Sequence, residues 1–249
     1  MRIAVLADIH GNIRALEAVQ ADLGRHSPDI VVNLGDHVSG PLQAAATADL
    51  LMSEHYVQIR GNHDRQLNDR DPAQMGASDC AAYAQLNSRH LEWLANLPAS
   101  QIIGDNILLC HGSPRDDLEY LLEEVNGDGV RLSPAASIRS RLGGFEGPLI
   151  LCGHTHIPRD VILPNGVRLV NPGSVGLQAY DDTVPSLHYI ENGSPEARYA
   201  IIDWSTKGAR VSFVVIPYDW ESASKEAAKA NRPDWAHALA TGYALRPGL

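Results

Sequence analysis

Short apolar runs that each end at a polar residue constrain the fold of this chain more than any other feature. Six runs are rich in β-branched and other apolar residues: 3–6, 29–34, 56–59, 106–110, 148–152 and 167–170. Runs of this length, bounded by Gly, Asp and Asn, are typical of strands buried on both faces. Helical patterns alternate with them, as in 12–26 and 41–55. This alternation predicts an α/β fold with a mainly parallel sheet covered by helices.

Metal-binding types of side chain follow five of these predicted strands at their carboxyl ends. In chain order they are Asp8 and His10, then Asp36, Asn62, His111, and finally His154 and His156. A helix cap or an Asx turn could explain any one of them alone. Ligands of open α/β sheets, however, bind outside the carboxyl ends of the strands. Their joint occurrence at that end indicates one shared site.

The number and type of these donors predict two metal ions. One tetrahedral zinc needs about four ligands, and calcium sites made of oxygen rarely use imidazole. Seven mixed nitrogen and oxygen donors fit two transition-type ions that share one bridging carboxylate, for which Asp36 is the natural choice. Only Asp8 and Asp36 among the seven are anionic, so the loaded site stays positive and attracts phosphate. Paired ions about 4 Å apart are suited to in-line displacement at phosphorus.

Composition limits the partners and the compartment. The formal net charge of −10 argues against general nucleic-acid or membrane binding, so we expect a small phosphorylated partner, with nucleotides among the candidates. The three cysteines, Cys80, Cys110 and Cys152, are well separated in the sequence, which favours a reducing compartment. Neither a signal-peptide pattern nor an apolar stretch of membrane-spanning length is seen. We therefore expect a cytoplasmic protein.

Two charge-rich segments interrupt the strand and helix pattern. Residues 65–98 contain a helical stretch, and residues 113–147 contain a Gly-rich turn. Both follow motif loops, so we expect cap-like insertions in a single domain that spans 1–249. After residue 180 the pattern changes to strands joined by Gly-containing turns, and a final helix is expected near Trp220.

The motifs resemble those of the calcineurin-like metallophosphoesterase superfamily. Its pattern appears here in order as "DIH" at 8–10, "GD" at 35–36, "GNHD" at 61–64, His111 in "CHGSP" and "GHTH" at 153–156. The segment "NPGSVG" at 171–176 is similar to the small bacterial phosphodiesterase-like subgroup. The resemblance implies a four-layer αββα sandwich of two mixed sheets, the metallo-dependent phosphatase fold. It also implies that the late strands belong to the second sheet.

The resemblance further implies a division of labour at the site. Asp8, His10, Asp36 and His156 would hold one ion, and Asp36, Asn62, His111 and His154 the other. The ions would be Mn, Fe, Zn or Ni, with Mg as an alternative. A bridging hydroxide would attack phosphorus, His63 would protonate the leaving oxygen, and Asp64 would orient His63.

Three further residues are candidates for substrate contact. His37 follows the bridging carboxylate and is either a rim contact or a loop histidine satisfied by backbone. Asn12 either touches phosphate or caps the following helix. Arg115 is a candidate for gripping the distal part of the substrate.

The predicted activity is metal-dependent hydrolysis of a phosphodiester or phosphomonoester. The alternatives are a protein serine/threonine phosphatase and a dinucleoside polyphosphate hydrolase. A non-catalytic metal-binding scaffold is the alternative from another class, and the complete ligand set together with His63 argues against it.

Overall fold

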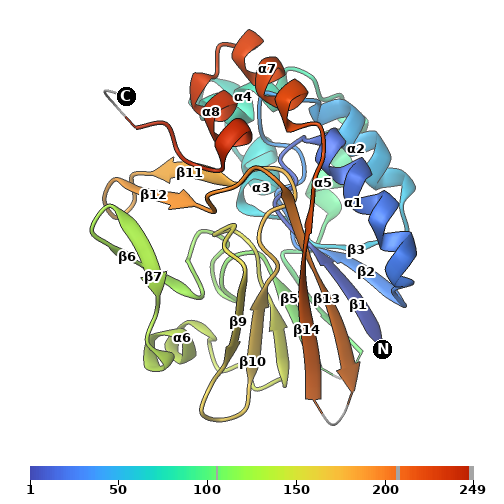
Figure 1. Ribbon diagram of the computed structural model, residues 1–249, viewed down its shortest axis with the longest axis vertical. Coiled ribbons are helices and arrows are strands. Elements are labelled where there is room, and N and C mark those ends of the chain that lie inside the picture. Colours follow the sequence, from blue (N-terminus) through green and yellow to red (C-terminus); the bar gives the residue numbers. More distant parts are fainter. Residues whose placement is uncertain (105, 206–207, 247–249) are drawn as a thin grey trace.

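The computed structural model describes residues 1–104, 106–205 and 208–246, and two mixed sheets form its centre (Figure 1). The first sheet has the order β14–β13–β1–β2–β3, and the second has the order β4–β5–β8–β10–β9. The first contains β1 (Arg2–Leu6), β2 (Ile30–Asn33), β3 (Val57–Gln58), β13 (Ala197–Ser205) and β14 (Gly208–Ile216). The second contains β4 (Ser100–Ile103), β5 (Ile107–Cys110), β8 (Leu149–Leu151), β9 (Arg159–Ile162) and β10 (Arg168–Asn171).

Two hairpins and several helices complete the described part of the chain. The hairpins are β6 (Glu123–Asn126) with β7 (Gly129–Leu132), and β11 (Ala179–Asp182) with β12 (His188–Glu191). The helices are α1 (Ile13–His26), α2 (Ala44–Ser53), α3 (Asn62–Asp69), the 3-10 turn η1 (Pro72–Gln74), α4 (Ala77–Tyr83), α5 (Ser88–Asn96), α6 (Ala135–Arg141), α7 (Trp220–Lys229) and α8 (Pro233–Thr241). No helix among the described residues combines the length and the apolar character needed to cross a bilayer.

The main apolar core lies between the two sheets. Ile3, Val5 and Val32 of the first sheet pack in one cluster with Leu109 and Leu151 of the second. Because β1, β5 and β8 are buried on both faces, their sequences are continuous apolar runs rather than alternating ones. The six predicted strands are all present, which confirms that the runs are strands. β3 has only two residues, and both are partly exposed, so burial on both faces does not hold for every run.

Helices cover the outer faces of both sheets, which confirms the predicted four-layer sandwich. Leu16 and Val19 of α1 pack on the outer face of the first sheet. Ile138 of α6 and the adjoining Leu142 pack against Leu108 and Ile150 on the outer face of the second. Part of the segment 113–147 is therefore a structural layer and not simply a cap.

The late strands are placed differently from the expectation. β13 pairs with β1 and with β14, both antiparallel, so β13 and β14 extend the first sheet. β12 pairs only with β11 among the described strands, in a separate hairpin. The prediction that these strands join the second sheet is wrong. The helical stretch predicted within 65–98 is also divided, because Asn87 caps α5 and separates it from α4.

Candidate metal centre

The loops that carry the predicted ligands meet at the carboxyl ends of β1, β2, β5 and β8. The strand pairs β1–β2 and β5–β8 are parallel, so their ends lie at the same edges of the two sheets. Five of the ligands have left-handed backbone conformations: Asp8, His10, Asp36, His154 and His156, with φ between 53° and 69°. This conformation is uncommon for residues other than Gly, and such strain concentrates at functional sites.

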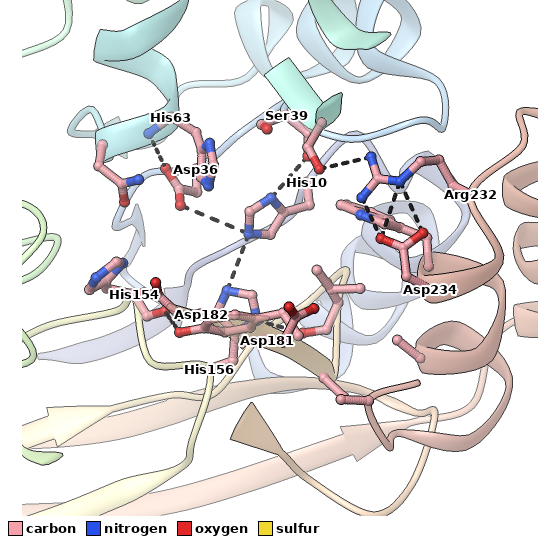
Figure 2. A pocket seen from close by; sticks show the side chains of 18 of the residues that line it. His10, Asp36, Ser39, His63, His154, His156, Asp181, Asp182, Arg232 and Asp234 are labelled. Carbon is pink, nitrogen blue, oxygen red and sulfur yellow. Dashed lines mark hydrogen bonds and ion pairs between the residues drawn. The ribbon is translucent and has the colours of Figure 1, made fainter. Parts of the chain in front are cut away.

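The first group of donors consists of Asp8, His10 and His156. One ligand atom from each lies within 4.8 Å of the others. The Nε2 atoms of His10 and His156 are 3.2 Å apart, and Nε2 of His156 lies 3.4 Å from Oδ1 of Asp8. All three side chains are buried. Figure 2 shows the imidazole of His10 between Asp36 and His156.

The second group consists of Asp36, His111 and His154, whose ligand atoms also lie within 4.8 Å of one another. Nε2 of His111 lies 3.2 Å from Oδ2 of Asp36 and 3.0 Å from Oδ1 of Asn62. Nε2 of His10 is 3.9 Å from the same Oδ2 of Asp36. Asp36 therefore lies between the two groups, as a bridging carboxylate requires.

The orientation of the imidazoles fits divalent cations. His10 donates from Nδ1 to the carbonyl of Ser39, His156 to that of Leu177, and His111 to that of Leu34, at 2.7–2.9 Å. A carbonyl only accepts, so Nδ1 carries a proton in His10 and in His156, and Nε2 is the nitrogen that faces the site. The two Nε2 atoms lie 3.2 Å apart, a pair that a proton or a cation between them would stabilise. Backbone contacts of this kind commonly orient metal-binding histidines.

The charges inside the site also fit the binding of divalent cations. Burial and the neighbouring His156 lower the pKa of His10 to about 4, and burial and His111 lower that of His154 to about 4. Both rings are therefore neutral, as a metal ligand must be. Burial by itself would lower the pKa of His111, but the charges of Asp36 and Asp8 raise it to about 10. Without a cation, a proton on His111 balances these two buried carboxylates.

His63 lies beside the metal ligands, with a partner that the sequence analysis missed. Its side chain lines the pocket, and its ring centroid is 5.7 Å from that of His10. Nδ1 of His63 bonds Oδ1 of Asp79 at 2.7 Å, and the hydroxyl of Ser39 donates to the same oxygen. Burial opposes a charge on His63, but Asp36 and Asp79 raise its pKa to about 9. The prediction that Asp64 orients His63 is wrong.

Asp64 instead ties together the two loops that carry Asp36 and Asn62. Its buried carboxylate accepts from the backbone N–H groups of Asp36, His37 and Gly61, at 2.8–3.0 Å. Nδ1 of His37 lies 2.7 Å from it as well. Asp64 lies in the N-terminal turn of α3 and faces back toward the cap residue Gly61, so its carboxylate does not contact the side chain of His63. Asp64 is a positioning residue.

The three predicted substrate contacts are also absent from the pocket lining. His37 is fully buried against Asp64 and Trp93. Asn12 is buried as well: it caps α1 through Ala15 and donates to the carbonyl of Gly176. Arg115 pairs with Glu119 on the surface. All three side chains are used in local packing or pairing. For Asn12 the structure confirms the capping alternative, whereas it gives His37 and Arg115 other partners than the predicted substrate.

A pocket of about 330 Å³ opens from the ligands and continues toward the C-terminal helices. The segment 65–98 contributes Gln66 and Ser78 to its lining, and the segment 113–147 contributes Leu118. Hairpin β11–β12 contributes Tyr180, and helix α8 with its cap residue contributes Arg232 and Trp235. Figure 2 shows Arg232 and Asp234 on this side of the pocket. No motif marks α8 in the sequence: the helix expected near Trp220 is α7, and α8 is a second helix that the sequence analysis missed.

The fold and the two donor groups define a metallophosphoesterase. Residues 1–158 match the family model described as calcineurin-like phosphoesterase. This match covers more than half of the chain, so the chain belongs to that family, whose members carry out metal-dependent hydrolysis of phosphoesters.

Individual relatives agree with this assignment. The chain is 26% identical over 258 residues to an uncharacterized protein of Methanocaldococcus jannaschii, with 94% of each chain covered. It is 27% identical to the crystal structure of a metallophosphoesterase from Sphaerobacter thermophilus, with a TM-score of 0.74 and coverage of 97% and 99%. A putative diadenosine tetraphosphatase at 17% identity and TM-score 0.54, with coverage of 87% and 94%, shares the fold.

Proposed function

We propose that this chain hydrolyses a small phosphoester at a pair of divalent metal ions. One ion would be held by Asp8, His10 and His156, and the other by Asn62, His111 and His154. Asp36 would be a ligand of both ions. When bound, the ions would polarise the phosphoryl group and lower the pKa of an attacking water. The observation that carries the proposal is the convergence of two buried imidazole Nε2 atoms, 3.2 Å apart, beside buried carboxylates.

In this proposal His63 is the general acid. Its Nδ1 is engaged by Asp79, so Nε2 is the atom that holds the proton to be given to the leaving oxygen. Positioned proton transfer of this kind contributes typically ~10²–10⁴-fold. Ser39 connects the metal-ligand group with the partner of His63. Its carbonyl accepts a hydrogen bond from His10, and its hydroxyl donates one to Asp79.

The dimensions of the site support a small substrate. The ligands are buried at the base of a pocket of about 330 Å³, which is the size of small-molecule sites. A protein serine/threonine phosphatase needs access for a folded partner, so this alternative is less well supported. The segments 65–98 and 113–147 contribute to the wall, which supports the proposal that they partly cover the site.

The test is metal content and activity on metal-stripped protein. Wild-type protein should bind two ions per chain and hydrolyse phosphoesters when Mn, Zn, Ni or Mg is restored. Asp36→Asn should lose both ions, because one carboxylate serves both groups. Glu146→Gln, an exposed acidic position, is the control and should keep both. Two ions still bound to Asp36→Asn would contradict the shared ligand, and no hydrolysis with any metal would contradict the function.

Manganese as the metal in cells and a cytoplasmic location stay predictions. The donor set of imidazole, carboxylate and amide suits several transition ions, and availability selects among them.

A further inference from the structure

The pocket extends beyond the metal ligands into an arm that we call the Trp235 arm. Its walls are Leu177, Ala179, Trp235, Ala238, Ala244 and Leu245. Trp235 is held rigidly, because its ring lies where a Cβ on Gly40 would be, and its centroid is 5.9 Å from that of His10. An apolar wall therefore begins directly beside a metal ligand.

The charges of the Trp235 arm do not suit an anion. Among the described lining residues, Arg232 is the only arginine or lysine. Its guanidinium bonds both carboxylate oxygens of Asp234 at 2.6–3.1 Å, and the hydroxyl of Ser78 at 3.0 Å. It also lies over the ring of Trp235, at 5.7 Å from the centroid. Asp181 and Asp182 line the same pocket and add negative charge.

We propose that the Trp235 arm binds the organic group of the substrate, and that this group is uncharged and apolar, such as an aromatic ring. A second phosphate there would meet carboxylates and no free cation, which disfavours dinucleoside polyphosphates. Trp235 is then a specificity-determining residue. This inference rests on the proposed function, since it names the substrate class of the same site.

Binding of phosphonates, which cannot be hydrolysed, tests the inference separately from catalysis. Ethylphosphonate, benzylphosphonate and 4-carboxybenzylphosphonate are titrated calorimetrically into manganese-loaded protein. Benzylphosphonate should bind about tenfold more tightly than ethylphosphonate, because its ring is buried against the apolar wall. The added carboxylate should remove most of that gain.

Variants test whether the preference for the benzyl group arises from the Trp235 arm. Trp235→Ala should lose the preference for the benzyl group and Trp235→Phe should keep most of it, whereas Trp220→Ala on α7 should match wild type. Leu245→Arg supplies the missing cation and should strengthen binding of 4-carboxybenzylphosphonate selectively. Equal affinities for ethyl- and benzylphosphonate, or tightest binding of the carboxylated ligand by wild type, would overturn the inference. Intact binding preferences with no hydrolysis of either benzyl phosphate or benzyl methyl phosphate would instead contradict only the proposed function.

Discussion

At the scale of single residues, the site depends on a carboxylate that no motif contains. Asp79 lies sixteen positions beyond His63 in the sequence, on α4, and it is 2% exposed at the side chain. The hydroxyl of Ser39 and the imidazole of His63 share its Oδ1. A buried carboxylate held in this way orients the ring and stabilises its protonated form.

Asp79→Asn should therefore weaken general-acid catalysis without removing the metals. The amide keeps the shape of Asp79 but not its charge, so the pKa of His63 falls relative to wild type. We expect kcat/KM for an alkyl ester to drop by ~10–100-fold and that for a nitrophenyl ester to change little, since nitrophenolate leaves without protonation. The decline of alkyl-ester hydrolysis at alkaline pH should begin at lower pH, because His63 loses its proton sooner.

Two comparisons check this assignment. Asp71→Asn, an exposed change in the same segment, should behave as wild type on both esters. In the double variant with His63→Ala, Asp79→Asn should add no further loss. Equal losses on both esters, or additive losses in the double variant, would show that Asp79 acts through something other than His63.

The convergence of the candidate ligands could be predicted from the sequence, whereas the partners of His63 and Asp64 could not. Strand ends fix where a ligand emerges, so Asp8, Asp36 and His111 follow from local pattern alone. Asp64 is adjacent to His63, but its backbone position in the first turn of α3 directs it to Gly61 and Asp36. Adjacency in sequence does not give the direction of a side chain.

At the scale of elements, β13 is one of the late strands that sequence reasoning assigned to the wrong sheet. The apolar residues of β13 predict a buried strand, but a strand with this pattern could belong to either sheet. Pairing with β1 is settled by long-range contacts, such as Ala200 with Val5 across the strands and Tyr199 with Asp22 on α1. Such contacts join residues about 180 positions apart and leave no local signal in one sequence.

The contact between Tyr199 and Asp22 should make stability depend on pH. The hydroxyl donates to Oδ2 of Asp22 at 2.7 Å. Burial opposes the charge of Asp22, but Tyr199, His26 and Arg25 outweigh it and hold its pKa below the ordinary value. The charged Asp22 therefore stabilises the folded state at pH values above the pKa that Asp22 has in the unfolded chain. This stabilisation is lost as the pH falls through the lower pKa of Asp22 in the folded state.

Tyr199→Phe should lower the free energy of unfolding by about 1.5 kcal/mol at pH 7, as expected for a buried hydrogen bond to a charged group. Urea unfolding of wild type and variant at several pH values measures the difference, which should stay constant down to about pH 5 and shrink below about pH 4. Tyr243→Phe, at an exposed position, is the control. A difference that does not change with pH would mean that the charge of Asp22 is not involved.

At the scale of the whole molecule, the candidate metal centre lies at the end of a core shared by both sheets. Ligands from the first sheet, such as Asp8, face ligands from the second, such as His156, across that end. Cations bound between them would hold the two sheets together. Ligands that bind only the folded state stabilise it by mass action.

Thiol labelling can report this coupling. Cys80 is exposed, whereas Cys110 and Cys152 are buried at the ends of β5 and β8, beneath the layer that contains α6. Burial raises the pKa of Cys110 to about 12 and raises that of Cys152 well above its ordinary value. Because the thiolate is the reactive form, the folded protein should react at one position only.

We expect a disulfide-exchange reagent to modify one thiol per chain rapidly in the folded protein and three after denaturation. Cys110 and Cys152 lie under α6 on the outer face of the second sheet, so their slow reaction requires either local loss of the α6 layer or unfolding of the protein. Metals that bind only the folded state suppress unfolding, so the slow reaction should slow further when manganese is added and quicken after the metals are stripped. Cys80→Ser should abolish only the rapid phase. If metals leave the slow phase unchanged, the two thiols react through local opening of the α6 layer, and the expected stabilisation of the folded state by metals is contradicted for this part of the molecule.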